Sequence, residues 1–437
     1  MKSHHFVSSP VDSLQGDITV PGDKSISHRS IILGAIAKGV TTVHGFLDGE
    51  DCLSTMQAFR NMGVSIEGPV SQRVVIHGVG KHGLEKPENV IDCGNSGTTM
   101  RLLAGLLAAQ PFDTELTGDQ SLLKRPMERV SRPLHQMGAA ISTTKGRPPL
   151  LIRGGQSLHG ITYEMPEASA QVKSSLLLAG MYAKGETRVI EPGLTRDHTE
   201  RMLTAFSYPI HKSGNAIVIN AASECLGTDV IVPGDISSAA FFIVAATIVP
   251  GAELFIRNVG INPTRTGIIQ ILKRMGASIK ITNKRLCGEE LVADLYVKHA
   301  PLEGIDIPAA MVPLAIDEFP VIFVAASCAK GQTVLHGAKE LRCKESDRIT
   351  AMADGLKILG IDAEALDDGI RINGGVIRGG VVDSRRDHRI AMAFTIAGSV
   401  AKDPVTILHC ANVATSFPTF VKTANKVKLN VQETNDA

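Results

Sequence analysis

The sequence of 437 residues lacks the features that mark several classes of protein. Its net charge of +1 argues against a nucleic-acid binder that works by bulk electrostatics. Its seven cysteines are odd in number, scattered and free of Cys-x-x-Cys pairs. That pattern excludes an obvious zinc site or disulfide framework and is typical of a reducing compartment. No uncharged apolar run approaches the ~20 residues that a membrane span requires.

The first residues also lack the apolar segment of a signal peptide. We therefore expect a soluble cytoplasmic protein that binds no nucleic acid, membrane or metal. What the sequence does contain is typical of a globular protein, with 43% hydrophobic and 20% charged residues. A chain of this length exceeds one ordinary hydrophobic core, so two domains are expected.

One pattern recurs six times along the chain, with copies that begin near residues 39, 111, 185, 251, 331 and 404. Each copy consists of a strand, an amphipathic helix, two further strands and a more apolar helix. In the first copy Asp51 is expected to cap the amphipathic helix, and Met62 and Gly63 to end it. A fixed period of about 70 residues predicts a repeat architecture of six units.

The apolar helix of each copy should be buried, because it is apolar on nearly every side. A polar cluster precedes or opens each one, and the N-terminus of a helix carries partial positive charge. The six helix starts should therefore gather into one positively polarised cleft. Their clusters contain Lys24 and Ser25, Asn95 to Thr98, Ser169 and Gln171, Asp235 to Ser238, Asp317 and Glu318, and Asp387 to Arg389.

Pro21, Gly22 and Asp23 recur 212 positions later as a second Pro-Gly-Asp triplet at 233–235. Three repeats lie between the two copies. We therefore expect two domains of three repeats each, with crossovers near 21–23 and 233–235. One domain would span 24–235, and the other 1–23 plus 236–437, so that the N-terminal strand (about residues 1–20) belongs with the C-terminal half.

The richest helix start is the segment 24–30, where Lys24, Arg29 and three serines crowd the first turns of an apolar helix. Packing gives no reason to place so many polar groups there, whereas an anionic ligand does. The spacing from Gly16 to Lys24 is one residue too long in two places for the phosphate loop G-x4-G-K-[ST]. The sequence therefore predicts an anion site of another kind.

Further clusters of the same character follow along the chain. The segment 94–101 is a turn of small residues at a helix start, where backbone N–H groups can approach an anion, although it also fits an ordinary Asn/Ser cap. The charged turn around Arg196 equally fits a solvated surface turn. The runs that contain Arg348 and Arg389 lie directly against buried helices and are harder to explain as surface.

Taken together, these motifs resemble the 5-enolpyruvylshikimate-3-phosphate synthases in order and spacing over essentially the full length. The resemblance implies an inside-out α/β barrel fold with two domains and an active site in the interdomain cleft. It also implies transfer of the enolpyruvyl group of phosphoenolpyruvate to the 5-hydroxyl of shikimate 3-phosphate, with release of phosphate, in aromatic amino-acid synthesis. No cofactor is implied, and we expect a monomer.

The resemblance also implies roles for individual residues. The proton-transfer candidates are Asp317, Glu345 and Lys24. The residues expected to bind shikimate 3-phosphate are Lys24, Ser25, Arg29, Ser169, Gln171, Arg196, Asp317 and Lys344. The residues expected to bind phosphoenolpyruvate are Lys24, Gly97, Arg125, Gln171, Arg348 and Arg389.

Two of these positions have further consequences. Asp317 also fits a helix N-cap, and the two roles are compatible. Family members insensitive to glyphosate often carry Ala where this chain has Gly97, so we expect a glyphosate-sensitive enzyme. Two other functions remain open: a UDP-N-acetylglucosamine enolpyruvyl transferase, whose loop cysteine has no counterpart here, and a non-catalytic anion-binding scaffold, which would not need Asp317 and Glu345.

Overall fold

The computed structural model describes residues 4–435, which divide into two compact units. Unit 2 consists of Gly22–Val232 together with Cys287–Glu289, and unit 1 contains the rest of the described chain. The chain thus leaves unit 1 after Pro21 and returns to it at Pro233. Residues 287–289 group with unit 2, whereas the predicted bounds place them in the other domain.

Unit 2 contains three four-stranded sheets with one common topology. In each sheet the first strand runs parallel to the second, and the second runs antiparallel to the third. The sheets, in spatial order, are β14 (Asp229–Ile231), β3 (Lys38–His44), β5 (Arg73–Val79) and β4 (Ser65–Val70); β6 (Ile91–Asp92), β7 (Thr114–Thr117), β9 (Arg147–Arg153) and β8 (Ala140–Thr144); and β10 (Thr162–Glu164), β11 (Thr187–Ile190), β13 (Ala216–Ile219) and β12 (His211–Ser213).

Two sheets of unit 1 repeat this topology and are completed by the N-terminal strands, whereas the third has three strands that pair antiparallel. β1 pairs with both β22 and β23, and β2 runs parallel to β15. The sheets are β2 (Gln15–Thr19), β15 (Glu253–Gly260), β17 (Glu290–Lys298) and β16 (Ser278–Cys287); β21 (Gly380–Asp383), β22 (Val405–Leu408), β1 (His4–Ser9) and β23 (Asn430–Asn435); and β18 (Gln332–Leu335), β20 (Gly369–Asn373) and β19 (Asp362–Leu366).

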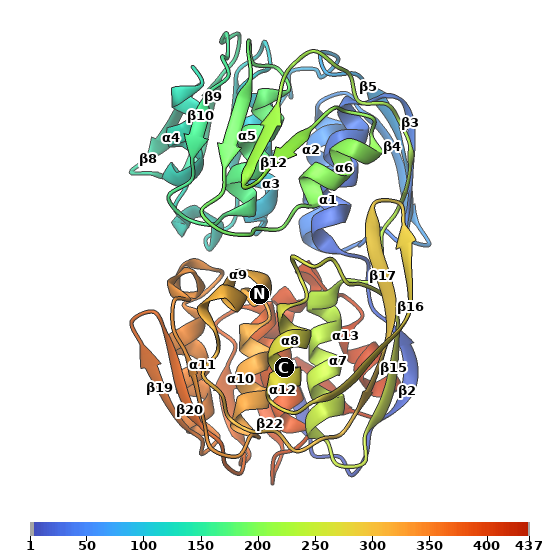
Figure 1. Ribbon diagram of the computed structural model, residues 1–437, viewed down its shortest axis with the longest axis vertical. Coiled ribbons are helices and arrows are strands. Elements are labelled where there is room, and N and C mark those ends of the chain that lie inside the picture. The colour runs from blue at the N-terminus through green and yellow to red at the C-terminus, as the bar shows by residue number, and fades with distance from the viewer. Residues whose placement is uncertain (1–3, 436–437) are drawn as a thin grey trace. The chain divides into compact units, whose positions relative to one another are not determined.

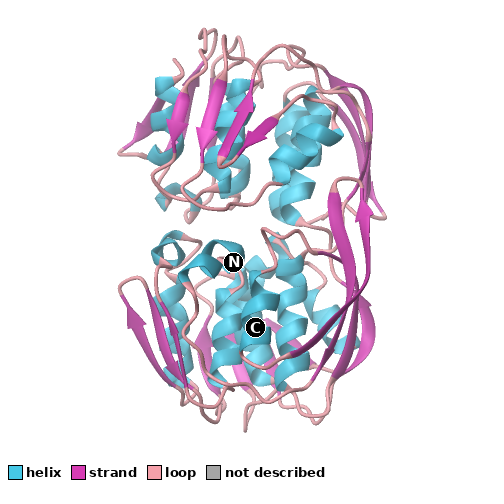
Figure 2. Cartoon of the chain, in the orientation of Figure 1, coloured by secondary structure: helices cyan, strands magenta, loops and turns pink. Residues whose placement is uncertain are grey.

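Six apolar helices form the interior, three in each unit, and strands flank them on the outside (Figures 1 and 2). They are buried along nearly their whole length because they present apolar side chains in every direction. This arrangement is the predicted inside-out α/β barrel with six repeats. The helices are α1 (Lys24–Ile36), α3 (Gly97–Leu107) and α5 (Ala170–Gly180) in unit 2, and α7 (Ile236–Ile248), α10 (Phe319–Ser327) and α12 (His388–Gly398) in unit 1.

The remaining helices connect the strands of each repeat. They are α2 (Glu50–Asn61), α4 (Glu128–Gln136), α6 (His198–Ala205), α8 (Gly267–Arg274), α9 (Val312–Ala315), α11 (Arg348–Ile358) and α13 (Phe420–Lys426), with 3₁₀ turns η1 (Leu122–Lys124), η2 (Ala309–Met311), η3 (Lys339–Cys343) and η4 (Cys410–Thr415).

The first of these helices corrects one prediction and confirms another. Asp51 is not the N-cap of α2: Gly49 takes that position, and Asp51 lies in the first turn of the helix. The helix does end at Met62, and Gly63 adopts the left-handed conformation that the termination requires, with φ of +84°.

Within residues 4–435, no single helix is both long and apolar enough to cross a membrane; one pair, Ala309–Ala315 and Phe319–Ser327, reaches the length only jointly and is bent by 119°. All seven cysteines are free.

Candidate active site

The start of α1 contains Lys24, Ser25 and Arg29 of the predicted anion site. Asp23 caps the helix by accepting a hydrogen bond from the backbone N–H of Ile26 at 2.9 Å. The N-cap carboxylate of Asp23 is the acidic group at this end of the helix, because the first turn itself contains no acidic residue. A close backbone approach fixes the turn before it: a Cβ on Gly22 would lie 1.9 Å from the carbonyl oxygen of Gly45, so only glycine fits.

Two cationic side chains belong to the first turns of α1. Lys24 forms an ion pair with Asp51, with 3.0 Å between Nζ and Oδ2, and both side chains are largely buried. Arg29 donates to the hydroxyl oxygens of Thr199 (2.6 Å) and Ser174 (2.8 Å) and to the carbonyl oxygen of Ser25 (2.9 Å). Arg29 is therefore held in place by α5 and α6.

The start of α3 places Gly97 beside two arginines. Ser96 caps the helix, accepting from the N–H of Thr99 at 3.1 Å. A Cβ on Gly97 would lie 3.0 Å from Nη1 of Arg101 and 3.1 Å from Nη1 of Arg125. Asn95 in turn orients Arg125, accepting from its Nη2 at 2.9 Å. The small residue leaves the first N–H groups of α3 accessible between two guanidinium groups.

The start of α5 joins the same cluster. Gln171 accepts from Nη1 of Arg101 at 2.6 Å and donates to the hydroxyl of Thr98 at 2.9 Å, so it bridges α3 and α5. Ser169 is the N-cap of α5 and accepts from the N–H of Val172 at 3.4 Å. Arg196 lies in the loop just before α6 and is partly exposed.

Unit 2 therefore brings together the starts of α1, α3 and α5 through these side chains. Its predicted site residues are Lys24, Ser25, Arg29, Gly97, Arg125, Ser169, Gln171 and Arg196.

In unit 1 the central group is Arg348, the first residue of α11, which is 1% exposed. Asp387, fully buried, accepts from its Nε at 2.8 Å and from its Nη2 at 3.2 Å, and Glu345 accepts from Nη2 at 2.6 Å. Burial alone would lower the pKa of Arg348, but the charges of Asp387, Glu345 and Asp317 outweigh it and raise the pKa above its usual value. Arg348 is a permanent cation.

Asp317 and Lys344 complete this cluster. Oδ1 of Asp317 lies 3.4 Å from Nζ of Lys344 and 3.5 Å from Nη1 of Arg348. Lys344 also donates to Glu340 at 2.9 Å. Asp317 and Glu345 both remain partly exposed, at 17% and 16% of their side chains. Two carboxylates that can reach a ligand thus flank a buried guanidinium.

The structure corrects the N-cap interpretation of Asp317. Helix α10 begins at Phe319, and the residue before it is Glu318, which makes no side-chain cap bond. Asp317 lies in the turn between α9 and α10 and faces Lys344 and Arg348 instead.

Arg389 is the least satisfied cation of unit 1. It is the second residue of α12, only 7% exposed, and its backbone N–H donates to Asp387 at 2.9 Å. Within residues 4–435 its guanidinium forms neither a hydrogen bond nor an ion pair. A largely buried cation without a partner is costly unless a ligand supplies the negative charge.

Several residues of these clusters were absent from the predicted set, among them Asp51, Arg101 and Asp387. Arg101 could have been found from its spacing, because it stands four residues after Gly97 and hence on the same helix face. The contact between Asp51 and Lys24 joins positions 27 residues apart, and no local pattern predicts it.

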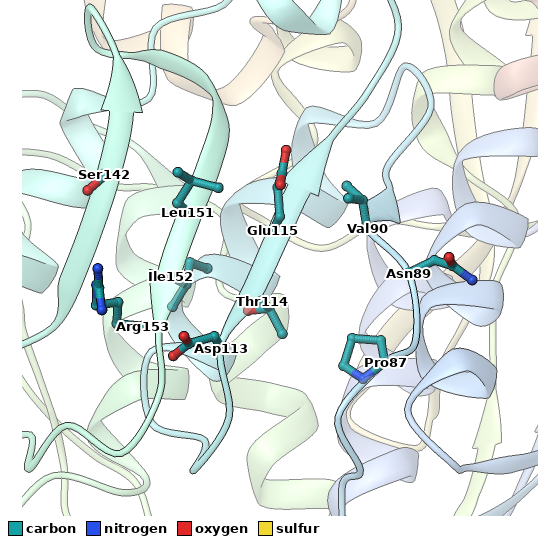
Figure 3. A pocket seen from close by; sticks show the side chains of 10 residues that line it. All are labelled: Pro87, Asn89, Val90, Asp113, Thr114, Glu115, Ser142, Leu151, Ile152 and Arg153. Atoms are coloured by element: carbon teal, nitrogen blue, oxygen red, sulfur yellow. The ribbon is translucent and has the colours of Figure 1, made fainter.

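A surface pocket of about 390 Å³ lies elsewhere in unit 2, on the sheet that contains β7 and β9 (Figure 3). Glu115, Leu151 and Arg153 line it, and none of the predicted site residues does.

Known proteins share the sequence pattern and the fold of this chain. The family model of EPSP synthase (3-phosphoshikimate 1-carboxyvinyltransferase) matches residues 9–424. A 3-phosphoshikimate 1-carboxyvinyltransferase of Legionella pneumophila (strain Philadelphia 1) is 67% identical over 98% of this chain and 99% of its own length. The enzyme of the same name from Methylococcus capsulatus is 60% identical over 98% of each chain.

Solved structures give the same result. EPSP synthase from Acinetobacter baumannii superposes with a TM-score of 0.88 at 56% identity, over 99% of this chain and 100% of that one. The enolpyruvyl transferase NikO from Streptomyces tendae covers both chains fully with a TM-score of 0.81, but at 16% identity it shares the fold alone. Matched by the family model along almost its whole length, and 67% identical to a named member, the chain belongs to the EPSP synthase family.

Proposed function

We propose that the two clusters described above carry out the reaction of this family. The chain is a 3-phosphoshikimate 1-carboxyvinyltransferase: it transfers the enolpyruvyl group of phosphoenolpyruvate to the 5-hydroxyl of shikimate 3-phosphate and releases phosphate. The reaction belongs to the shikimate pathway of aromatic amino-acid biosynthesis. Membership of this family favours it over the UDP-N-acetylglucosamine enolpyruvyl transferase and the non-catalytic scaffold.

The observation that carries this proposal is the largely buried guanidinium of Arg389, which has no hydrogen-bond or ion-pair partner within residues 4–435. Its backbone N–H and the permanently charged Arg348 both donate to Asp387. Phosphoenolpyruvate brings a phosphate and a carboxylate, and both bind best to planar guanidinium donors and helix N-termini. Each predicted substrate set takes residues from both units. The phosphoenolpyruvate set is Lys24, Gly97, Arg125, Gln171, Arg348 and Arg389.

Shikimate 3-phosphate binds chiefly through the starts of α1 and α5. Arg29, locked by Thr199 and Ser174, supplies a rigid cation there. These bonds orient the guanidinium group, which can then pair with a phosphate. The set is Lys24, Ser25, Arg29, Ser169, Gln171, Arg196, Asp317 and Lys344.

The chemistry needs an acid and a base. The 5-hydroxyl loses its proton as its oxygen bonds to the central carbon of phosphoenolpyruvate, and the methylene carbon gains a proton, which gives a tetrahedral intermediate. That intermediate then loses a proton from the new methyl group and expels phosphate. Asp317, Glu345 and Lys24 are the groups that move these protons, because each is partly exposed beside a cation or a carboxylate.

The decisive test measures phosphate release from phosphoenolpyruvate with either acceptor. Release with shikimate 3-phosphate and none with UDP-N-acetylglucosamine is expected. The opposite preference would assign the chain to the other transferase, and binding without release would make it a scaffold.

Gly97 carries a proposal about inhibition. A Cβ at this position would touch only the ends of the Arg101 and Arg125 side chains, which can shift by a few tenths of an ångström. Gly97→Ala therefore folds, but its methyl group fills space between the two guanidinium groups. We expect glyphosate to inhibit the wild-type chain and to inhibit Gly97→Ala more weakly. Wild-type turnover that millimolar glyphosate leaves unchanged would contradict this.

Finally, we propose that the chain acts as a monomer in the cytoplasm. Its seven free cysteines support a reducing compartment. Light scattering on the eluted protein is expected to give the mass of one chain, and a dimer mass would contradict the monomer.

A further inference from the structure

Two neighbouring acidic residues between α9 and α10 have opposite environments. The Asp317 side chain is partly exposed and faces Lys344 and Arg348. Glu318, the next residue, is 1% exposed, and its carboxylate accepts a hydrogen bond from another helix of unit 1. A glutamate is almost never fully buried unless a polar partner compensates it, so its surroundings require an explanation.

The partner of Glu318 is the hydroxyl of Ser237, in the first turn of α7. Ser237 Oγ donates to Oε1 of Glu318, and Nη2 of Arg265 donates to the same Oγ at 2.7 Å. Arg265 also donates to Asp235, the N-cap of α7, at 3.0 Å. All four side chains are buried.

Helix ends make this burial of a carboxylate possible. Glu318 immediately precedes α10, and Ser237 is the second residue of α7, so the carboxylate lies near the positive ends of two helices. Arg265 adds a full positive charge one hydrogen bond away. The other oxygen, Oε2, makes no hydrogen bond within residues 4–435, so Ser237 is the sole hydrogen-bond partner of this side chain there.

The turn is fixed from its other side as well. Helix α8 begins at Gly267, two residues after Arg265, and a Cβ there would lie 2.7 Å from the carbonyl carbon of Leu314. Helices α8 and α9 are therefore in close contact at Gly267 and Leu314. Leu314 lies three residues before Asp317. Movement of this turn must break either this contact or the bond from Glu318 to Ser237.

We infer that Glu318 is a positioning residue for Asp317. By bonding to Ser237 it fixes the first turn of α10, and with it the direction in which the Asp317 carboxylate points. The inference rests on the proposed role of Asp317 in proton transfer. A carboxylate that must remove or deliver a proton acts only from a narrow range of positions, and displacement by about 1 Å can cost on the order of 100-fold in rate.

The test uses the full chain and measures kcat for phosphate release. Ser237→Ala removes the hydroxyl and leaves the bond between Arg265 and Asp235 in place. Glu318→Gln keeps the shape and removes the charge. Each is expected to lower kcat by about 10- to 100-fold. In an Asp317→Asn background the same changes should lower the residual kcat by less than about 3-fold, because the group they position is already gone.

Ser327→Ala is the matched control. Ser327 is the last residue of α10, at the end far from Asp317. Its hydroxyl donates to the carbonyl oxygen of Phe323 in the same helix, and its loss should leave kcat unchanged. Thermal unfolding of each variant checks that it folds. If Glu318→Gln does not fold, Ser237→Ala decides the question, since it removes one oxygen atom.

Each outcome separates the inference from the proposed function. Wild-type kcat in both variants, beside a large loss in Asp317→Asn, would overturn the positioning role alone. Losses that multiply fully with that of Asp317→Asn would show a general structural role instead. An unaffected Asp317→Asn would remove both the role of Asp317 and the inference, and a wild-type chain without phosphate release would remove the proposed function.

Discussion

The two units hold their site cations with different chemical groups. In unit 2, hydroxyl, amide and carbonyl oxygens orient the arginines: Arg29 bonds to Thr199 and Ser174, and Arg125 bonds to Asn95. In unit 1, carboxylates surround Lys344 and Arg348.

A neutral acceptor orients a guanidinium without cancelling its charge, so the charge remains for a ligand. A carboxylate cancels that charge, but it can also take up and release a proton. From this difference we expect unit 2 mainly to bind anions, and unit 1 mainly to supply the proton-transferring groups. Each unit has one exception to this pattern. In unit 2 Lys24 pairs with the carboxylate of Asp51, and in unit 1 the guanidinium of Arg389 has no partner within residues 4–435.

The largest expected effect tests the chemical role of unit 1. Glu345→Gln keeps the size of the side chain and removes its capacity to exchange a proton, so kcat should fall by about 100- to 10,000-fold. Glu340→Gln, which alters the other carboxylate beside Lys344, should change KM for shikimate 3-phosphate more than kcat. Steady-state phosphate release measures kcat and KM for each variant. Equal losses of kcat in the two variants would show that Glu345 has no chemical role beyond that of Glu340.

A smaller effect tests the binding role of unit 2. Arg125→Ala removes a charged donor beside Gly97, worth roughly 1.5–3 kcal/mol, so KM for phosphoenolpyruvate should rise about 10- to 100-fold with a lesser change in kcat. Asn95→Ala leaves the charge and removes only its orienting partner, so a smaller rise is expected. If Arg125→Ala lowered kcat alone, unit 2 would take part in the chemistry and the comparison would fail.

The smallest effect concerns stability and tests the positive charge at the start of α1. His28 bonds to the hydroxyl of Thr55 at 2.7 Å, and burial, followed by the charges of Lys24 and Arg29, holds its pKa well below 6.5. The unfolded chain therefore binds a proton that the folded chain excludes as pH falls below about 6.5. The free energy of unfolding should fall there by up to about 1.4 kcal/mol per pH unit through this group, and should not change through it above that pH.

Urea unfolding of the full chain at pH 5.5 and 7.5 measures this dependence. His28→Asn should weaken it, whereas His44→Asn, which alters an exposed histidine of β3, should not. An unchanged pH dependence in His28→Asn would show that His28 is not held neutral.

The repeat architecture could be read from the sequence because the buried helices are apolar on nearly every side and all but α10 open with a side-chain cap. Asp23, Ser96 and Ser169 all cap their helices through the side chain. The short strand ahead of most of these helices was missed. β6 has two residues and β10 has three, too few for an alternating pattern to show.

The site was harder to predict than the fold. The local sequence pattern does not distinguish Asp317 from Glu318, because they are adjacent acidic residues before the same helix. The structure gives them different partners: Asp317 pairs with Lys344, and Glu318 bonds to Ser237. The pairing of Asp387 with Arg348 joins positions 39 residues apart and depends on the packing of α11 and α12. The roles given to individual site residues stay predictions until the variants are measured.

The pairing of β1 with β22 and β23 has a consequence for biosynthesis. Unit 2 is nearly continuous in sequence, and the strands of its three sheets all lie within residues 22–232. Unit 1 cannot complete the sheet of β1 until β23, at 430–435, has been translated. Because domains fold as units during synthesis, the emerging chain should finish its anion-binding unit first, while residues 4–9 wait for partners some 400 positions away.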